Sequence, residues 1–199
     1  MKVTVIDYGL SNLLSVQHAF AHFGAEVQVT SSPADVLAAD ALVLPGVGAF
    51  HDGMQGLEQL GLIEPIKQKT AQGTLLLGIC LGMQMMNTYF LVAEEAERRG
   101  WDGPLLALFE QMKKERYMFT EPVDGHWDGH ITRDNVDRFK HPIHVTPGSR
   151  LERLTGKQTL LGASMHNYRI THQARSLTVA GRTDRAAEPL SGNKSDSCS

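Results

Sequence analysis

The chain has 199 residues, 42% of them hydrophobic and 21% charged, which is typical of a globular domain that buries its apolar surface without disulfides or metals. Its formal net charge is −3 at pH 7 and no basic block stands out, so nucleic acid and membrane surfaces are disfavoured as partners. Two cysteines, Cys80 and Cys198, suggest no disulfide framework and favour a reducing, cytoplasmic location. The opening "MKVTVIDYGL" predicts a strand rather than a signal peptide, and no apolar run is long enough to span a bilayer.

Strands and helices alternate in the first half of the chain. Four strands are expected, at residues 2–7, 25–30, 41–46 and 74–79. Three helical segments are expected between them, at residues 13–24, 31–40 and 50–72. Ser11 or Asn12 is suited to cap the first of these helices, and Gly61 to interrupt the last. This order predicts an α/β fold with an open, mostly parallel, flavodoxin-like sheet and helices on both faces.

The second half of the chain is less regular. A helix is expected to continue after Cys80, and another is expected over "GPLLALFEQMKKERYMF". Residues 120–141 are polar and rich in turn residues, which predicts a hairpin or loop. A short strand and a short helix follow, and "QTLLGASMHNYRI" and "RSLTVAGRTD" are each expected to form one strand. We therefore expect a single domain over residues 1–187 and a disordered tail at 188–199.

Cys80 lies at the carboxyl end of the fourth predicted strand, where ligands bind in open parallel sheets. Gly78 and Gly82 flank it in the pattern G-x-C-x-G, the cysteine form of a nucleophile elbow, in which small neighbours permit a strained turn. The helix expected from Leu81 directs its N–H groups and positive dipole end at the sulfur, which predicts a lowered thiol pKa. The alternative is a small core residue packed between glycines.

A glycine-rich loop follows the third predicted strand. Gly46, Val47 and Gly48 come after "LVLP", and their backbone N–H groups, together with that of Leu81, are candidates to stabilise an oxyanion beside Cys80. The alternative is that both glycines serve only the turn.

Three segments, "IDYGLSNLLSV", "LPGVGAFHDGM" and "LLGICLGMQMM", occur in this order within the first 86 residues. Together they resemble the class I (triad-type) glutamine amidotransferases, and most closely the glutaminase subunits of imidazole glycerol phosphate synthase, in histidine biosynthesis. The resemblance implies that Cys80 attacks the carboxamide of glutamine and forms a glutamyl thioester. It also implies that ammonia passes to a synthase (cyclase) partner of (β/α)8 type, and we expect no cofactor and no catalytic metal.

The resemblance also implies a glutamine pocket. Residues 46–48 take the place of the family's oxyanion strand, and Gln84 that of a residue that helps to bind glutamine. "SMHNYRI" resembles the family's His-Ser-Tyr strand, so His166, Asn167 and Tyr168 are expected to contact the substrate, with Asn167 in place of the usual serine.

The base and the carboxylate of the family's triad have no clear counterpart here. The family carries a late His-Pro-Glu, whereas the only His-Pro of this chain, His141-Pro142, is followed by isoleucine and precedes the pocket strand. His166 is the best candidate base by position, although a pocket-lining role suits it better. Asp184 and Glu188 fall near the expected acid without a histidine beside them, so neither is assigned.

Other functions stay open. "HPIHVTPGSRLERLTG" before "SMHNYRI" resembles the gamma-glutamyl hydrolase branch, which uses the same thioester chemistry without channelling ammonia. The missing His-Pro-Glu suits a non-catalytic remnant that keeps the glutamine pocket. A flavodoxin-like nucleotide binder is disfavoured because no G-x-G-x-x-G or P-loop follows the first strand. His126 and His130 lack a third ligand, so we expect no metal site.

Overall fold

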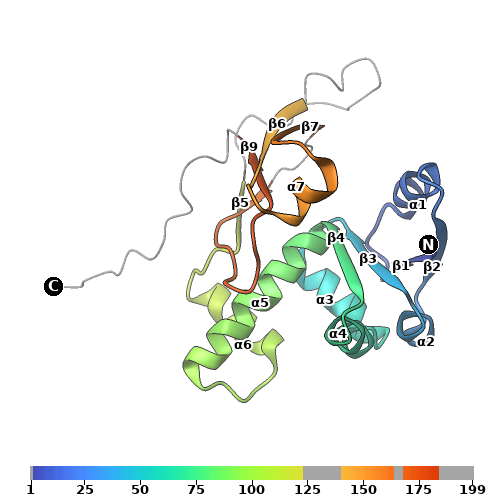
Figure 1. The fold of residues 1–199 in the computed structure, drawn as a ribbon. Coiled ribbons are helices and arrows are strands. Elements are labelled where there is room, and N and C mark those ends of the chain that lie inside the picture. The colour runs from blue at the N-terminus through green and yellow to red at the C-terminus, as the bar shows by residue number, and fades with distance from the viewer. Residues whose placement is uncertain (1, 123–139, 164–167, 184–199) are drawn as a thin grey trace. The chain divides into compact units, whose positions relative to one another are not determined.

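The structure is a computed structural model that describes residues 2–122, 140–163 and 168–183 (Figure 1). The chain divides into two compact units, Met1–Tyr89 and Phe90–Ser199. One helix, α5 (Leu81–Arg99), begins in the first unit and ends in the second. The predicted continuation of a helix after Cys80 is therefore confirmed.

The first unit is built on a four-stranded sheet with the strand order β2-β1-β3-β4 (Figure 1). Its strands are β1 (Lys2–Ile6), β2 (Glu26–Thr30), β3 (Ala41–Gly46) and β4 (Leu75–Cys80). Every neighbouring pair of strands is parallel, which confirms the predicted sheet. The register pairs Gly46 with Cys80 at the carboxyl ends of β3 and β4, so the glycine-rich loop starts beside the cysteine.

Helices cover both faces of this sheet, as predicted. They are α1 (Leu13–His22), α2 (Pro33–Leu37), α3 (Phe50–Gln59) and α4 (Ile63–Ala71). One face packs on α1, through the apolar side chains of Val3, Val5, Leu13, Val16, Phe20 and Val43. The other face packs on α2, α3 and α4, through Ile6, Val36, Leu42, Leu44, Leu57 and Ile66. The predicted break between α3 and α4 is confirmed at Gly61, whose φ of 63° lies in the left-handed region that favours glycine.

The turn from β1 into α1 is fixed by two side chains. The Asp7 Oδ1 atom accepts a hydrogen bond of 3.0 Å from the Gly9 N–H, which closes an Asx turn. Asn12, rather than Ser11, is the N-cap of α1, because its side chain accepts a hydrogen bond of 3.3 Å from the Ser15 N–H.

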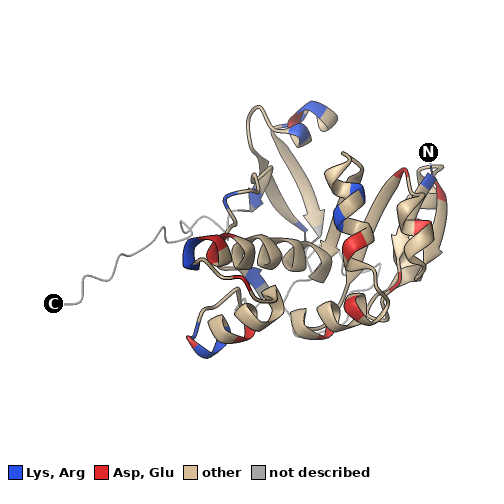
Figure 2. Cartoon of the chain, turned by 90° about the horizontal axis from the view of Figure 1, so that it is seen from below, with Lys and Arg blue, Asp and Glu red and all other residues tan. Residues whose placement is uncertain are grey.

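The second unit contains two small antiparallel sheets. Its helices after α5 are α6 (Leu105–Lys114) and α7 (Arg150–Thr155). Its strands are β5 (Thr120–Pro122), β6 (Lys140–Val145), β7 (Thr159–Ala163), β8 (Tyr168–Ile170) and β9 (Gly181–Thr183). β5 pairs with β8, while β6 lies between β7 and β9. Acidic and basic residues lie side by side near the end of α5 (Figure 2).

Two strand predictions in this unit are wrong. "QTLLGASMHNYRI" is not one strand, because it supplies β7 to one sheet and β8 to the other. "RSLTVAGRTD" forms a strand only at its end, in β9. Before β9 the Leu177 N–H donates to the Ala174 carbonyl at 3.1 Å, and the Ser176 N–H donates to Glu94 at 3.2 Å. These turn and side-chain bonds use donors that a strand would give to its neighbour.

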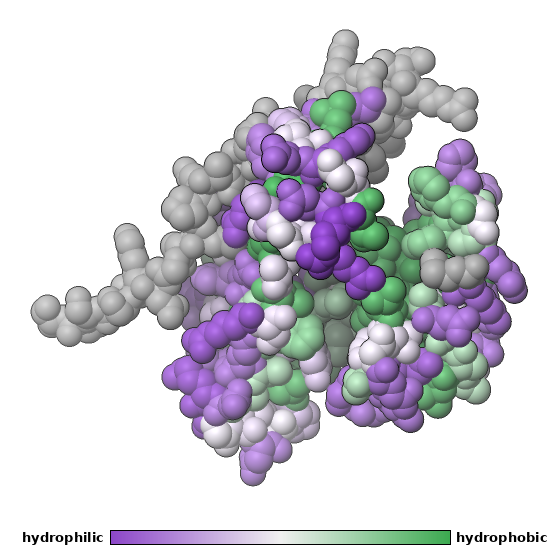
Figure 3. Space-filling model, viewed as in Figure 1, coloured by the Kyte–Doolittle hydropathy of each residue, from purple (hydrophilic) through white to green (hydrophobic). Residues whose placement is uncertain are grey.

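Apolar side chains remain exposed in the first unit. Leu14 and Phe23, at the two ends of α1, are 62% and 86% exposed, and hydrophobic surface is visible over α1 in Figure 3. Leu75 and Leu77 of β4 are about half exposed. A continuously apolar strand is expected to be covered on both faces, which holds for the buried β3 but not for β4, the edge strand of the described sheet.

Candidate functional site

Cys80 lies at an abrupt change from strand to helix. It is the last residue of β4, and Leu81 is the first residue of α5. The φ of Cys80 is 52°, a left-handed conformation that is strained for a residue with a side chain. The structure therefore has the turn that the G-x-C-x-G pattern predicts, and it places the sulfur-bearing residue at the carboxyl edge of the parallel sheet.

The two glycines of this pattern allow close packing of helix on strand. A Cβ atom on Gly78 would lie 2.7 Å from the backbone nitrogen of Met83. A Cβ atom on Gly82 would overlap the carbonyl oxygen of Leu44 in β3. The first turn of α5 thus lies directly against the ends of β3 and β4, and a side chain at either glycine would push it away.

The environment of the thiol raises its pKa rather than lowering it. The Cys80 side chain reaches solvent, but partial burial of the sulfur raises the pKa of the thiol by desolvating the thiolate. The prediction of a lowered pKa is therefore wrong, because partial burial desolvates the charged thiolate. Since the thiolate is the nucleophile, reaction at neutral pH needs a base that takes the thiol proton.

The loop after β3 approaches Cys80 from the neighbouring strand. Gly46 is buried and paired in register with Cys80, whereas Val47 is 54% exposed and Gly48 has a φ of 96°. The Val47 N–H donates a hydrogen bond of 2.8 Å to the Leu10 carbonyl. In this conformation the N–H is directed to the β1–α1 turn, and it can serve an oxyanion only if that hydrogen bond is exchanged.

Tyr8 is a neighbour of this site that the sequence patterns do not reveal. It is 3% exposed, and its hydroxyl donates to the Sδ atom of Met85 at 3.7 Å. Burial raises the pKa of Tyr8 to about 12, so the hydroxyl keeps its proton at neutral pH. In the sequence Tyr8 belongs to the turn "YGLSN", and only the folding of α3, α5 and β3 around it shows where its side chain lies.

The remaining predicted residues fall into two groups. Gln84 lies half-buried in the first turn of α5. Tyr168 is the first residue of β8, in the second unit, where it is paired with Pro122. The other predicted residues, His126, His130, His166, Asn167, Asp184 and Glu188, lie outside the described residues. The base that Cys80 needs is therefore not assigned.

Metal-binding groups and membrane-spanning helices are both absent from the described part of the chain. Within residues 2–122, 140–163 and 168–183, no three histidine, cysteine or acidic side chains are grouped so that they could hold a metal ion. Over the same residues, no helix has the length and apolar character needed to cross a membrane.

Comparison with known proteins places these features in one family. The family model described as "Glutamine amidotransferase class-I" matches residues 4–188. Among curated proteins, imidazole glycerol phosphate synthase subunit HisH 1 of Legionella pneumophila (strain Paris) is 60% identical over 85 residues, which are 43% of this chain and 40% of the relative. Subunit HisH of Symbiobacterium thermophilum is 47% identical over 109 residues, 55% of this chain and 48% of the relative. The aligned part of this chain thus spans less than half the length of these relatives.

A solved structure supports the fold. A crystal structure of a protein from Thermoplasma acidophilum, described as one of the subunits of a GMP synthase, superposes with a TM-score of 0.57 at 15% sequence identity. The superposition covers 93% of this chain and 74% of that protein.

Proposed function

This chain belongs to the class-I glutamine amidotransferases, and we propose that it is a glutaminase subunit that supplies ammonia to a synthase partner. The observation that carries the proposal is the geometry of Cys80. A cysteine in a left-handed conformation joins β4 directly to α5 and lies beside Gly46. A structural cysteine in a core needs neither the strained turn nor the adjacent glycine-rich loop.

The reaction follows from the atoms at this turn. A base takes the thiol proton of Cys80, and the sulfur attacks the side-chain carbonyl carbon of glutamine. Negative charge develops on the carbonyl oxygen, and the proposed hydrogen-bond donors to it are the Leu81 N–H and the loop at residues 46–48. The Val47 N–H can take part only after it exchanges its hydrogen bond to the Leu10 carbonyl. The carbon–nitrogen bond then breaks, the nitrogen takes a proton and leaves as ammonia, and a glutamyl thioester remains. Water cleaves the thioester, which releases glutamate and restores the thiol.

The names of the relatives suggest the acceptor of the ammonia. Several curated relatives of this chain are subunits of imidazole glycerol phosphate synthase. We therefore propose that the partner is the cyclase subunit of that synthase, of (β/α)8 type, and that the pathway is histidine biosynthesis. Gln84 and the segment His166–Tyr168 are the proposed glutamine contacts. A cytoplasmic location is part of the same proposal.

The test is release of glutamate and ammonia from glutamine, with and without the cyclase. We expect turnover that rises when the cyclase is present and that falls on the order of 10⁴-fold or more in Cys80→Ala, the scale of losing a catalytic nucleophile. Cys198→Ser is the matched control, because it removes the other cysteine, and it should retain full turnover. Full hydrolysis by Cys80→Ser would exclude Cys80 as the nucleophile.

The same assay separates the alternatives. Turnover that does not respond to the cyclase, on gamma-glutamyl amides as well as on glutamine, would favour a gamma-glutamyl hydrolase-like enzyme. Labelling of Cys80 by a glutamine-analogue electrophile without turnover would indicate a remnant that keeps its pocket but has lost its base.

A further inference from the structure

Tyr8 lies against the end of β3, where the candidate oxyanion loop begins. A Cβ atom placed on Gly46 would overlap the hydroxyl oxygen of Tyr8 and would lie 3.1 Å from the Cβ atom of Leu81. The hydroxyl and Leu81 thus fill the space where a side chain of residue 46 would project. Three groups meet at this point: the end of β3, the first residue of α5 and the hydroxyl of Tyr8.

Tyr8 has little room to move away from this position. A Cβ atom on Gly56 of α3 would lie 2.5 Å from the Tyr8 carbonyl oxygen and 3.4 Å from its Cδ2 atom, so α3 packs closely on the backbone and the ring. On α5, the Met85 Sδ atom accepts the hydroxyl hydrogen bond, and Met85 is itself 2% exposed. Because interiors are close-packed, a shift of the Tyr8 ring would require α3 or α5 to move as well.

The turn that carries Tyr8 also contacts the next residue of the loop. Its shape is set by the hydrogen bond from the Gly9 N–H to Asp7. Two residues after Tyr8, the Leu10 carbonyl accepts the Val47 N–H at 2.8 Å. The turn therefore contacts two consecutive residues of the loop, Gly46 through the Tyr8 side chain and Val47 through the backbone.

We propose that Tyr8 is a positioning residue, whose hydroxyl sets the distance between the Gly46 end of β3 and the first residue of α5. This inference rests on the proposed function, because that distance matters chemically when the N–H groups around Cys80 stabilise an oxyanion. The volume of the hydroxyl oxygen, rather than its hydrogen bond, holds β3 and α5 at this distance. Its acceptor, the thioether of Met85, is only a weak hydrogen-bond acceptor, so little depends on the strength of the bond.

The first test is Tyr8→Phe, assayed with the cyclase present. The variant leaves a gap beside Gly46, and we expect kcat for glutamine to fall about tenfold or more while KM changes by less than about twofold. Alkylation of Cys80 by iodoacetamide should keep the wild-type rate, since displacement at an sp³ carbon forms no oxyanion. The melting temperature should also stay close to that of the wild type. Unchanged kcat would overturn the proposal, as would an equal loss of alkylation rate.

Met85→Leu is the matched control. It removes the sulfur acceptor and keeps a similar side-chain volume, so kcat should remain at the wild-type level. If Met85→Leu lowered kcat as much as Tyr8→Phe does, the hydrogen bond rather than the oxygen's volume would be the cause, and the spacing role would be wrong.

A second measurement tests the spacing role of Tyr8 without using turnover. It remains informative if the wild type shows no turnover, a result that would contradict only the proposed function. Gly46→Ala forces a Cβ atom onto the Tyr8 hydroxyl and should lower the melting temperature. Adding Tyr8→Phe removes that oxygen and should restore part of the loss, because residues in contact are not additive. Additive shifts from the two substitutions would show that the hydroxyl does not set the spacing.

Discussion

The reactivity of Cys80 depends on two opposing effects on one sulfur. The N-terminus of α5 favours the thiolate, while partial burial disfavours it and raises the pKa of the thiol. A raised pKa means a smaller thiolate fraction at pH 7 than in an exposed cysteine. We therefore predict that alkylation of Cys80 by iodoacetamide rises with pH and has its midpoint above that of the free thiol of glutathione. The rate should be measured from pH 6 to pH 11 in the Cys198→Ser background.

Cys80→Ala in the same background is the control for this prediction, and it should not be labelled at all. A midpoint below that of glutathione would contradict the prediction and would mean that the helix N-terminus dominates. The expected result also bears on mechanism, because a thiol that is mostly protonated at neutral pH depends on its base for turnover.

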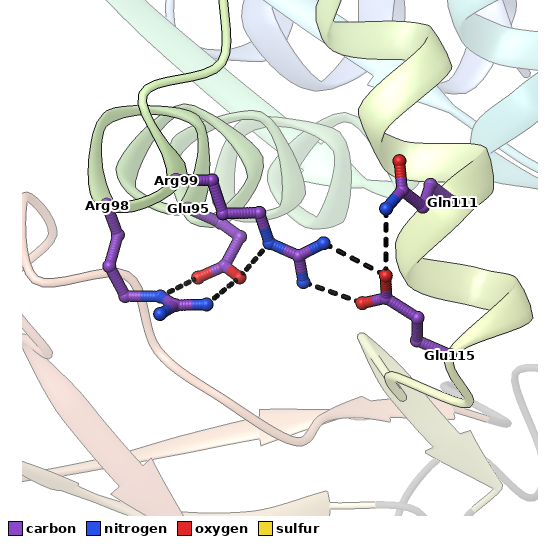
Figure 4. A network of polar contacts seen from close by, with 5 residues as sticks. All are labelled: Glu95, Arg98, Arg99, Gln111 and Glu115. Carbon is purple, nitrogen blue, oxygen red and sulfur yellow. Dashed lines mark hydrogen bonds and ion pairs between the residues drawn. The ribbon is translucent and has the colours of Figure 1, made fainter.

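A network of charged side chains joins helices α5 and α6 in the second unit. Arg99 of α5 donates to Glu95 at 2.5 Å and, through two nitrogens, to Glu115 at 2.9 and 2.6 Å (Figure 4). Arg98 also donates to Glu95, and Gln111 donates to Glu115 (Figure 4). The network thus ties the end of α5 to the end of α6 through charge-assisted, partly bidentate bonds.

The pKa values of both carboxyl groups give this network a pH dependence. Hydrogen bonds from Arg98 and Arg99 lower the pKa of Glu95 to about 2, and hydrogen bonds from Arg99 and Gln111 lower that of Glu115 to about 2. An unperturbed glutamate has a pKa of about 4.3. A folded-state pKa below the unfolded value stabilises the fold above about pH 4.3, and the stabilisation is lost as pH falls through about 2.

Arg99→Gln should therefore lower the melting temperature at pH 7, by about 1–4 °C for a network that joins two helices. The difference from the wild type should shrink as pH falls from about 4 to about 2. Lys67→Gln is the matched control, because it breaks a single exposed pair with Glu64 of 2.7 Å within α4, which should be worth less than about 1 °C. A difference that persists at pH 2, or equal effects of the two substitutions, would count against this account.

Helices and strands that a local sequence pattern specifies were predictable from the sequence. Strand pairings between residues far apart in the chain were not. The strand at residues 41–46 coincides with β3 (Ala41–Gly46), because a continuous apolar run is a local signal. The pairing of β5 with β8 joins Glu121 to Arg169 across 48 positions, and no local pattern specifies such a pair. For the site, parallel strand ends predicted that Gly46 lies beside Cys80. The burial of the Tyr8 side chain was not predictable from the sequence, because it depends on how three elements pack around that side chain.

At the scale of the whole chain, we expect the two units to unfold together. We propose that residues 1–187 form one amidotransferase-like domain, in keeping with the family match over residues 4–188. Helix α5 passes from the first unit into the second without interruption. Because helix formation is cooperative along the chain, melting of one end of α5 should promote melting of the other.

Fluorescence can report on one unit alone, since both tryptophans, Trp101 and Trp127, belong to the range of the second unit. Leu42→Ala in the first unit and Leu108→Ala in the second are a matched pair, with leucines that are 1% and 0% exposed. Each should cost about 2–5 kcal/mol, or about 4–20 °C of melting temperature. If the chain unfolds as one domain, Leu42→Ala shifts the tryptophan midpoint as far as it shifts the far-UV circular dichroism midpoint. A tryptophan transition that moves with Leu108→Ala but stays in place with Leu42→Ala would show that the two units unfold separately.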